Sequence, residues 1–367
     1  MSNGPLHGVR IVEFAGLGPT PFAAMTLADM GAEVIRIQRP GLKHLMGLEY
    51  DILDRGRSFV ELDLKNASDI ETVKALLSEA DALIEGMRPG VMERLGLGPQ
   101  EVATLNPRLV YGRMTGWGQD GPLAHAAGHD INYIALSGAL HAIGPKDTPV
   151  IPLNLIGDFG GGGMYMAYGI VCALFESTRS GLGQVVDTAI TDGTAHLMSM
   201  IYAMQQGKAW SDRRESNILD GAAPFYGVYE CACGGHVAIG AIEPKFYAEL
   251  LHRIGADADL AETQMKRSTW PDVRAQFAAI FATKTRDAWS ELLLGTDCCY
   301  APVLTIEEAY HAPHNTARGH FKKNDEIAAP APTPKLSRTP GLVQECFQNV
   351  PLNVKDVVQK WQETRKK

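Results

Sequence analysis

The strongest constraint on the fold is a regular alternation of short apolar runs and amphipathic helical stretches in the first half of the chain. Five runs rich in β-branched residues predict strands, at residues 8–15, 33–40, 57–64, 81–87 and 108–115. Helices are predicted between them at 22–30 and at 67–79, where Ile70, Val73 and Leu77 recur at helical spacing. Strands that alternate with helices pair in parallel, so this half predicts an α/β fold with a large, doubly wound, Rossmann-like domain.

The glycine-rich middle of the chain continues this pattern. A long apolar helix is expected at 164–178, a strand at 184–190 and a further helix at 193–206. The longest nearly apolar run, 162–175, is too short to span a bilayer and predicts a buried helix.

The pattern changes after residue 206. Residues 226–242 predict an antiparallel hairpin with a Gly-Gly turn, and helices are expected at 245–254 and 271–281, which together indicate a smaller α+β domain. The four prolines within 328–340 favour an extended segment that returns the chain elsewhere. The expected organisation is a large domain at 1–205, a linker at 206–223, the small domain at 224–310, a returning linker at 311–340, and a C-terminal segment at 341–367 that packs back on the large domain.

Composition and charge narrow the class of protein. Hydrophobic residues make up 45% and charged residues 21% of the chain, which is typical of a globular protein. The formal net charge of -8 argues against nucleic acid as a partner, because general nucleic-acid binders are usually basic. The N-terminus has no apolar signal region, and the C-terminus KWQETRKK has no peroxisomal tripeptide. With six cysteines and no secretory signal, we expect reduced thiols, a cytoplasmic location and no membrane partner.

The first predicted strand ends in a glycine turn. Gly16 and Gly18 occupy the first two positions of a G-x-G-x-x-G dinucleotide motif, but Pro21 stands at the third. The second strand ends in Gln38 and Arg39, where an NAD site would have an acid. An arginine there fits a phosphorylated ribose, as in NADP or in the 3′-phosphate of coenzyme A. A tight turn beside a surface arginine explains the same residues.

Basic residues recur at predicted loop positions. Arg55, Arg57, Lys65, Arg88 and Arg94 all flank the third and fourth strands. In a parallel sheet the carboxyl ends of the strands share one edge, where ligands bind, so Arg39, Lys65 and Arg88 are expected at that edge. Together they indicate an anionic, nucleotide-like ligand, although each one alone would be an ordinary solvated charge.

Three residues are candidates for proton transfer. His129 and Asp158 lie in glycine-flanked segments, AAGHDINY and LIGDFGGGG, which leave room for a ligand. Glu243 follows the hairpin just before a helix. Each has a structural alternative: a loop histidine, a helix N-cap for Asp158, and an acid at the start of a helix for Glu243. A helix N-terminus would lower the pKa of Asp158 and a dry pocket would raise it, and the sequence leaves both open.

The cysteines do not indicate a metal site or a catalytic thiol. Cys231, Cys233 and His236 form C-x-C-x-x-H, but no second cysteine pair follows at ligand spacing, so no metal is expected. Cys298 and Cys299 have no histidine at a motif spacing.

At this point the segments match a known family. The chain resembles the class III CoA-transferase superfamily and, within it, the α-methylacyl-CoA racemases. The resemblance runs almost end to end, and it includes GVRIVEFAGLGPTPFAAMTLADMGAEVIRIQRP, RMTGWGQDGP, PLNLIGDFGGGG, GQVVDTAITDG and AIEPKFYAELL. The stretch GHDINYIALSGALHAIG is the most specific for the racemase branch, whereas DRGRS, around Arg55 and Arg57, departs from the family's usual pattern.

The resemblance implies the roles of particular residues. His129, Asp158 and Glu243 match the racemases' catalytic histidine, aspartate and glutamate. The expected CoA-binding positions are Arg39, Leu62, Asp63, Leu64, Lys65, Glu85, Arg88, Arg94, Gly128, Asp130, Ile131, Asn132 and Tyr133. Coenzyme A is then part of the substrate, and no separate cofactor is required. The resemblance also implies an interlocked homodimer, with each active site between one subunit's large domain and the other's small domain.

Racemisation next to a thioester needs one base on each face of a planar enolate. His129 and Asp158 are the expected pair, which requires burial to raise the pKa of Asp158, and Glu243 would orient His129. Backbone N–H groups near Asp130 or after Asp158 would stabilise the enolate oxygen. Four methionines, Met164, Met166, Met198 and Met200, could support the acyl chain or fill the core.

Two other functions fit parts of the sequence. A CoA-transferase would use Asp158 to form an acyl anhydride, but it would not need His129 and Glu243. An NADP-dependent reductase or a silent nucleotide-binding module would use the glycine turn, although Pro21 weakens that motif. The acyl chain stays open among bile-acid precursors, branched fatty acids and short chains.

Overall fold

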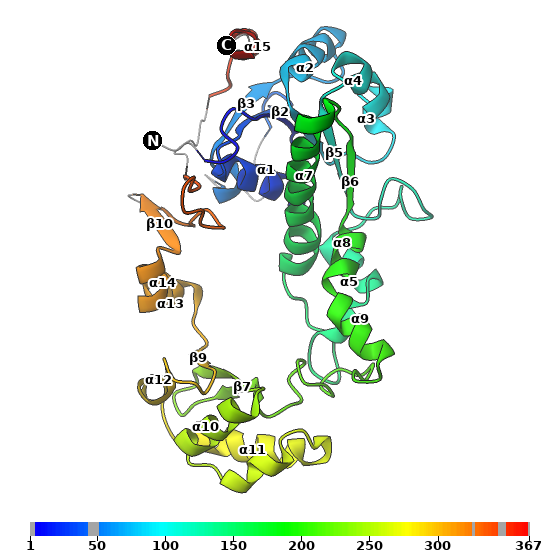
Figure 1. Cartoon of the computed structure of the whole chain (residues 1–367). Coiled ribbons are helices and arrows are strands. Elements are labelled where there is room, and N and C mark those ends of the chain that lie inside the picture. The colour runs from blue at the N-terminus through cyan, green and yellow to red at the C-terminus, as the bar shows by residue number, and fades with distance from the viewer. Residues whose placement is uncertain (1–3, 43–50, 325–326, 344–349, 366–367) are drawn as a thin grey trace. The chain divides into compact units, whose positions relative to one another are not determined.

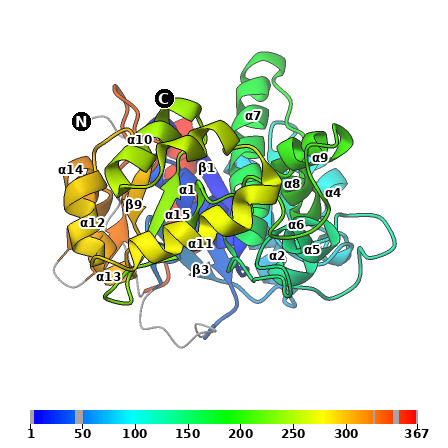
Figure 2. The ribbon, with the colours of Figure 1, turned by 90° about the horizontal axis from the view of Figure 1, so that it is seen from below.

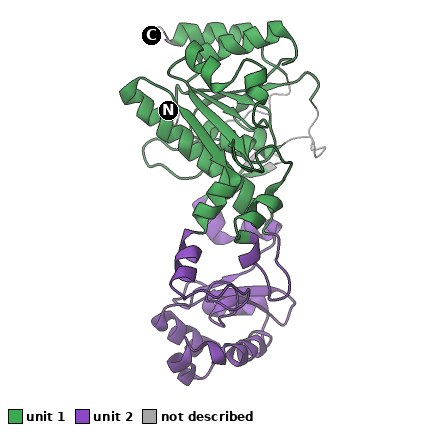
Figure 3. Ribbon diagram, turned by 90° about the vertical axis from the view of Figure 1, so that its right-hand side faces the viewer, with its two compact units in different colours: residues 1–139, 152–198, 319–367 green, residues 140–151, 199–318 purple. Residues whose placement is uncertain are grey.

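The computed structural model describes residues 4–42, 51–324, 327–343 and 350–365 (Figure 1). The chain forms two compact units (Figure 3). Unit 1 consists of Met1–Ala139, Pro152–Met198 and Gly319–Lys367, and unit 2 consists of Leu140–Ile151 and Ser199–Arg318. The domain limits expected from the sequence stay predictions.

Unit 1 is built on a six-stranded parallel sheet with the strand order β3-β2-β1-β4-β5-β6. The order reverses direction between β1 and β4, as in doubly wound nucleotide-binding folds. The α/β fold and the parallel sheet predicted from the alternating pattern are confirmed. The strands are β1 (Arg10–Phe14), β2 (Glu33–Gln38), β3 (Arg57–Glu61), β4 (Ala82–Glu85), β5 (Val110–Thr115) and β6 (Val185–Ala189).

Helices cover both faces of this sheet, so its central strands are apolar on both sides. In β1, Ile11 packs with Ala24 of α1 (Pro19–Asp29) and Ile170 of α7 (Met164–Ser180). Val12, its neighbour, belongs to the opposite core with α2 (Ala67–Glu79) and α15 (Val354–Arg365), where Trp361 is fully buried. Shorter helices complete the unit: α3 (Val91–Arg94), α4 (Pro99–Leu105), α5 (Asp130–Leu136), α8 (Ile190–Leu197) and the 3₁₀ turn η1 (Ile52–Asp54).

Several boundaries differ from the sequence expectation. Helix α1 begins at Pro19, because proline is well suited to the first turn of a helix. The helix expected at 193–206 is two helices, α8 and α9 (Ser199–Gln206). The proline-rich segment begins with β11 (Ile327–Pro330), which pairs antiparallel with β10 (Phe321–Asn324). The short helix α6 (Ala139–Ala142) falls at the division between the units.

Unit 2 contains a three-stranded antiparallel sheet of β7 (Tyr226–Glu230), β8 (His236–Gly240) and β9 (Tyr300–Pro302). The predicted hairpin is confirmed. Its core is rich in aromatic side chains, with Phe225, Tyr247, Phe277, Phe281 and Trp289 almost fully buried. The surrounding helices are α10 (Pro244–Ile254), α11 (Trp270–Phe281), α12 (Arg286–Leu293), α13 (Ile306–His311) and α14 (Pro313–Arg318), with 3₁₀ turns η3 (Ala258–Thr263) and η4 (Arg267–Thr269) (Figure 2).

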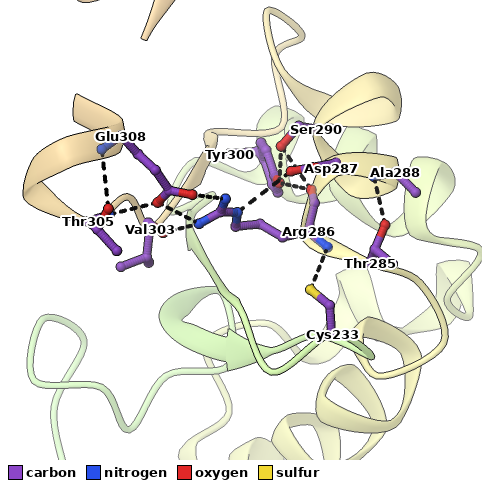
Figure 4. A network of polar contacts seen from close by, with 10 residues as sticks. All are labelled: Cys233, Thr285, Arg286, Asp287, Ala288, Ser290, Tyr300, Val303, Thr305 and Glu308. Atoms are coloured by element: carbon purple, nitrogen blue, oxygen red, sulfur yellow. Dashed lines mark hydrogen bonds and ion pairs between the residues drawn. The ribbon is translucent and has the colours of Figure 1, made fainter. Parts of the chain in front are cut away.

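Arg286 ties the elements around β9 together (Figure 4). Its guanidinium group donates to the Val303 carbonyl and to Glu308 Oε2, both at 3.0 Å. The hydrogen bond from Arg286 and a second one from the Thr305 backbone N–H lower the pKa of Glu308 to about 2. The Arg286 backbone N–H donates to Cys233 Sγ at 3.4 Å, so this thiol lies against the start of α12. Among the described residues, no cluster of three His, Cys, Asp or Glu side chains could hold a metal ion, and no helix is long and apolar enough to cross a membrane.

Candidate active site

The candidate site lies at the carboxyl ends of β1 and β4, where the strand order reverses. Gly18, in the turn after β1, has φ +64°, and a Cβ atom there would lie 2.7 Å from Asp158 Oδ2. In a Rossmann site the pyrophosphate approaches this turn. Here the Asp158 carboxyl group lies against the turn, which argues against the dinucleotide-binding alternative. The same contact explains why position 18 is glycine, since a larger side chain would collide with Asp158.

Asp158 lies in the middle of a π-helix, η2 (Leu155–Gly163), which runs directly into α7. The helix expected at 164–178 is present as α7, but Asp158 already lies in helical backbone, which excludes the N-cap alternative. Wide helical turns of this kind are rare and occur frequently at functional sites. The glycines after Asp158 allow close packing: a Cβ on Gly161 would lie 2.5 Å from Thr194 Oγ1.

The carboxyl group of Asp158 is the most strongly perturbed acid at the site. Burial is the largest influence on it, and the pKa of Asp158 is raised to about 6. The charge of Asp130 adds to this increase, whereas a hydrogen bond with Asn154 and the charge of His129 act in the opposite direction. Of the two influences that the sequence left open, burial therefore outweighs any lowering of the pKa by a helix N-terminus, although Asp158 is only partly buried.

His129 is the N-cap residue of α5 and is exposed. Its backbone N–H donates to Asn132 Oδ1 at 3.0 Å, and its carbonyl oxygen accepts from the Asn132 N–H at 2.8 Å. Because its charge acts on the pKa of Asp158, His129 lies in the same neighbourhood. The structure thus brings together two of the three predicted catalytic residues.

Asp130 connects the two segments. Its Oδ1 atom accepts a hydrogen bond from the Asp158 backbone N–H at 2.7 Å, and the Gly157 N–H also donates to this carboxylate. Burial raises the pKa of Asp130, and these two hydrogen bonds oppose the shift. The side chain expected to contact coenzyme A is therefore committed to the backbone beside Asp158.

Tyr133 and Trp117 form an aromatic wall beside these residues. Their rings pack edge to face, with centroids 4.8 Å apart, and the Tyr133 hydroxyl donates to the Gly128 carbonyl at 2.5 Å. A Cβ on Gly116 would lie only 2.0 Å from the Tyr133 ring. Burial raises the pKa of Tyr133, and the charge of Asp158 adds to this effect. The sequence did not single out Gly116 and Trp117, because their importance comes from contacts with the Tyr133 ring, which lies further along the chain.

The basic candidates for CoA binding are solvent-accessible. Arg39 follows β2, Lys65 follows β3, and Arg88 and Arg94 follow β4, and all four side chains are exposed. Arg88 lies close enough to Tyr133 for its charge to lower the pKa of that residue. The carboxyl edge of the sheet therefore carries positive charge around the Asp158 region.

Other expected CoA-binding positions have different surroundings. Leu62 is buried and Leu64 is half-buried against the same core. Asp63 Oδ1 accepts from the Lys65 N–H at 3.0 Å. Glu85 is fully buried, accepts from the Met87 N–H at 2.6 Å and pairs with Arg113 at 3.0 Å. The Glu85 side chain therefore stabilises the loop after β4 through its hydrogen bond with the Met87 N–H, instead of facing a ligand.

Arg55 and Arg57 are not the solvated loop cations that the sequence indicated. Arg57 is buried and pairs with the fully buried Glu13, and Arg55 Nε donates to Asp29 at 2.9 Å. A further Arg55 nitrogen donates to the Pro330 carbonyl at 2.6 Å. Both guanidinium groups therefore pair with carboxylates within unit 1.

Glu243 belongs to unit 2. It is the N-cap residue of α10, directly after β8, and its exposed side chain lies near Cys299. Its carbonyl oxygen accepts from the N–H groups of Phe246 and Tyr247 at 3.0 and 2.9 Å. The start of a helix predicted for this acid is confirmed, and its role in chemistry stays a prediction.

Comparison with known proteins identifies the family of this chain. Residues 6–346 match the model of CoA-transferase family III. The alpha-methylacyl-CoA racemase of Mus musculus is 47% identical over 339 residues, covering 92% of this chain and 88% of that protein. The Homo sapiens alpha-methylacyl-CoA racemase is 45% identical over 341 residues with the same coverage. The crystal structure of a CaiB/BaiF family protein from Brucella suis has the same fold, with a TM-score of 0.81 at 23% identity, covering 98% of this chain and all of that one. The chain therefore belongs to CoA-transferase family III.

Proposed function

We propose that this chain is an α-methylacyl-CoA racemase, an isomerase that inverts C2 of 2-methyl-branched acyl-CoA thioesters. The observation that carries the proposal is the Asp158 carboxyl group, whose pKa of about 6 lies near neutrality, in the neighbourhood of His129. The similarity to the mouse and human racemases supports it over most of the chain.

The reaction is a proton transfer through an enolate. In one direction His129 removes the C2 proton and protonated Asp158 delivers a proton to the opposite face. In the other direction Asp158 is the base and protonated His129 is the acid. Breaking the C–H bond leaves its electron pair in the enolate, and reprotonation at C2 restores the thioester, so no oxidant or further reactant is consumed.

The raised pKa makes Asp158 a usable proton donor. At pH 7 a carboxyl group with a pKa of about 6 is protonated in about 9% of molecules, whereas one with an ordinary pKa is protonated in about 0.1%. This difference of about a hundredfold in the reactive form is comparable to the whole contribution of a general acid. The dry pocket against Gly18 is therefore central to the mechanism.

The enolate oxygen requires hydrogen-bond donors. The N–H groups of Gly157 and Asp158 already donate to Asp130, which removes them from the candidates. The first N–H groups of a helix have no intrahelical acceptor, so those of Asp130 and Ile131 in the first turn of α5 are assigned to the enolate oxygen.

The thioester's coenzyme A moiety would follow the basic edge of the sheet. Arg39, Lys65, Arg88 and Arg94 would bind its phosphate groups. The segments around them would contribute backbone and side-chain contacts through Leu62, Asp63, Leu64, Gly128, Asn132 and Tyr133. Of the methionines proposed for the acyl chain, Met164 of unit 1 is exposed and available, whereas Met166 is fully buried and belongs to the core.

We assign the quaternary structure as an interlocked homodimer. Helix α7 carries an exposed apolar stripe of Met164, Tyr168, Val171 and Phe175, which are 47%, 68%, 40% and 64% exposed. Such a stripe on a single chain is typical of a surface that another subunit covers. In this arrangement Glu243 of the partner subunit would orient His129 and hold its tautomer.

The test is incubation of one epimer of a 2-methylacyl-CoA with the enzyme in D₂O, followed by NMR and chiral analysis. A racemase incorporates deuterium at C2 and produces the second epimer. Absence of both changes with intact, folded protein would contradict the proposal.

The alternative within the family is transfer of CoA between carboxylic acids through an acyl anhydride on Asp158. It is favoured by one observation, the family match itself. Hydroxylamine trapping of an Asp158 adduct, together with CoA transfer to a free acid and no C2 exchange, would select it.

A further inference from the structure

The two proposed bases are connected by a single side chain that has no role in the chemistry described so far. Asp130 is the residue after His129; its Oδ1 atom accepts the Asp158 N–H at 2.7 Å, and the Gly157 N–H also donates to this carboxylate. The first turn of α5 is thereby fastened to the middle of the π-helix η2. A backbone displacement of η2 relative to the start of α5 would strain or break these hydrogen bonds.

The contact is closer than most side chains would permit. A Cβ atom on Gly157 would lie 2.2 Å from Asp130 Oδ1 and 2.8 Å from Ile134 Cγ2. Only glycine at position 157 lets the carboxylate reach the backbone. The glycine before Asp158 is therefore required by Asp130, in addition to leaving room for a ligand.

The other oxygen of the carboxylate is unusual. Asp130 Oδ2 is buried, and no described residue donates a hydrogen bond to it. A charged oxygen without a donor is costly in a dry environment, and a purely structural tether would be equally well served by a neutral amide. Retention of an acid at this position points to a use for its charge.

We propose that Asp130 is a positioning residue for Asp158, which fixes the spacing of the two bases through the backbone at Gly157 and Asp158 and places a negative charge beside the Asp158 carboxyl group. The catalytic importance of this contact rests on the proposed racemase function, whereas the contact itself does not depend on the substrate. The Asp130 side chain touches no reacting atom and acts through Asp158, whereas the backbone N–H of Asp130 is the group assigned to the enolate oxygen.

The electrostatic part has a direct physical basis. A neighbouring negative charge disfavours ionisation of a carboxyl group. Burial is the first cause of the raised pKa of Asp158, and the charge of Asp130 is the second. Removing that charge while keeping the hydrogen bonds should therefore leave the pKa of Asp158 below about 6 but still above its ordinary value.

The other ionisable groups near η2 are distributed over the elements packed against it. His129 lowers the pKa of Asp158, and Tyr133 lies on the same α5 segment with Arg88 close to it. The elements packed against η2 also carry Asp29 on α1, Asp187 on β6, Asp192 and His196 on α8, and Tyr165, Tyr168, Cys172, Glu176 and Arg179 on α7. Asp29 is paired with Arg55. Among the described residues, Asp130 is the one carboxylate whose charge raises the pKa of Asp158.

The test is the Asp130→Asn variant. Its carbonyl oxygen can still accept the two backbone hydrogen bonds, so the fold should be kept while the charge is lost. We expect the acidic limb of kcat/KM against pH to move down by about one pH unit, with little change in KM. The limb belongs to the pair of bases, so only its shift relative to wild type is interpreted. Asp120→Asn, which removes an exposed charge from the same unit, is the matched control and should leave the limb in place.

A second measurement works without turnover. Carboxyl ¹³C titration of Asp158, assigned by comparison with Asp158→Asn, should give a midpoint of about 6 in the wild type and a lower one in Asp130→Asn. An unchanged midpoint in the variant would overturn the electrostatic part. If wild-type enzyme failed to exchange the C2 proton but the midpoint still moved, the racemase proposal would fail and the role of Asp130 would stand.

The positional part has its own variant. Gly157→Ala keeps every charge but places a Cβ within 2.2 Å of Asp130 Oδ1. We expect kcat to fall about tenfold or more, with KM and the melting temperature close to wild type. A wild-type kcat would contradict the positional role. If Gly157→Ala did not fold, the Asp130→Asn variant would provide the test instead.

Discussion

Unit 1 contains two kinds of buried carboxylate, and their neighbours differ. Glu13, on the central strand β1, and Asp29, at the end of α1, have Arg57 and Arg55 as direct partners. Burial raises the pKa of Glu13, and the charge and hydrogen bonds of Arg57 oppose it. By contrast, no described arginine or lysine shifts the pKa of Asp158. After burial, the largest influence on it is the charge of another carboxylate, Asp130.

This difference distinguishes carboxylates that stabilise the fold from a carboxyl group that can transfer a proton. An arginine partner favours the ionised form of a buried carboxyl group, so Arg57 and Arg55 oppose the rise in pKa that burial causes in Glu13 and Asp29. A carboxyl group that is buried without such a partner titrates near neutrality and is available as an acid or a base. The chain thus uses the same residue type for two purposes, and the distinguishing feature is the cation.

The largest expected effect is loss of the unpaired acid. Asp158→Asn should lower C2 proton exchange by about 10³-fold or more, because the amide can neither donate nor accept the proton. The melting temperature should not fall, since the amide has no buried charge to solvate. Asp192→Asn, an exposed acid of α8, is the matched control. Substantial exchange by both Asp158→Asn and His129→Ala would disprove the two-base mechanism.

Breaking a paired acid should have the opposite profile. Arg57→Met leaves the fully buried Glu13 without its cation, which should lower the free energy of unfolding by about 3–5 kcal/mol. Urea denaturation measures this loss. The double variant Glu13→Gln, Arg57→Met should recover most of it, because no uncompensated charge remains. A single variant as stable as wild type would show that the pair is not structural.

The exposed acid of unit 2 provides a third case. Glu243→Gln should lower kcat by about tenfold or more while leaving the KM for the acyl-CoA unchanged, since its proposed task is to orient His129. Stability should be unaffected, because the side chain is exposed. Glu230→Gln, on β7 of the same unit, is the control. An unchanged rate would remove Glu243 from the mechanism.

Much of unit 1 was accessible from the sequence. The β-branched runs recur with helices between them, and β-branched residues suit a sheet that is buried on both faces, so six strands and their parallel pairing could be predicted. His129 and Asp158 could be singled out because glycines flank both. These signals are local, and each involves residues that are close in the chain.

The parts that were missed depend on distant partners. Arg55 and Arg57 resemble surface cations until Asp29 and Glu13 are found 26 and 44 positions away. Asp130 meets the Asp158 N–H across 28 positions. The π-helix has no periodic apolar pattern of its own over nine residues, and the glycines in it are also typical of a loop. Pairing of this kind is decided by tertiary packing and leaves little trace in the sequence.

The smallest effect concerns stability and pH. The pKa of Asp158 rises from 3.8 in an unfolded chain to about 6 in the folded protein, so the folded state binds this proton more tightly. The cost to stability is therefore absent below about pH 4, grows as the pH rises, and is complete above about pH 6. A shift of this size corresponds to about 3 kcal/mol, and partial exposure reduces the expectation to about 1–2 kcal/mol. Asp158→Asn should gain that amount relative to wild type between about pH 4 and 7 in urea denaturation. Glu13→Gln should instead be destabilised at neutral pH, because it removes the buried anion of Arg57 and leaves that guanidinium group with the partly exposed Asp54 alone. If both variants changed stability in the same direction, the presence of an arginine partner would not be what distinguishes the two carboxylates.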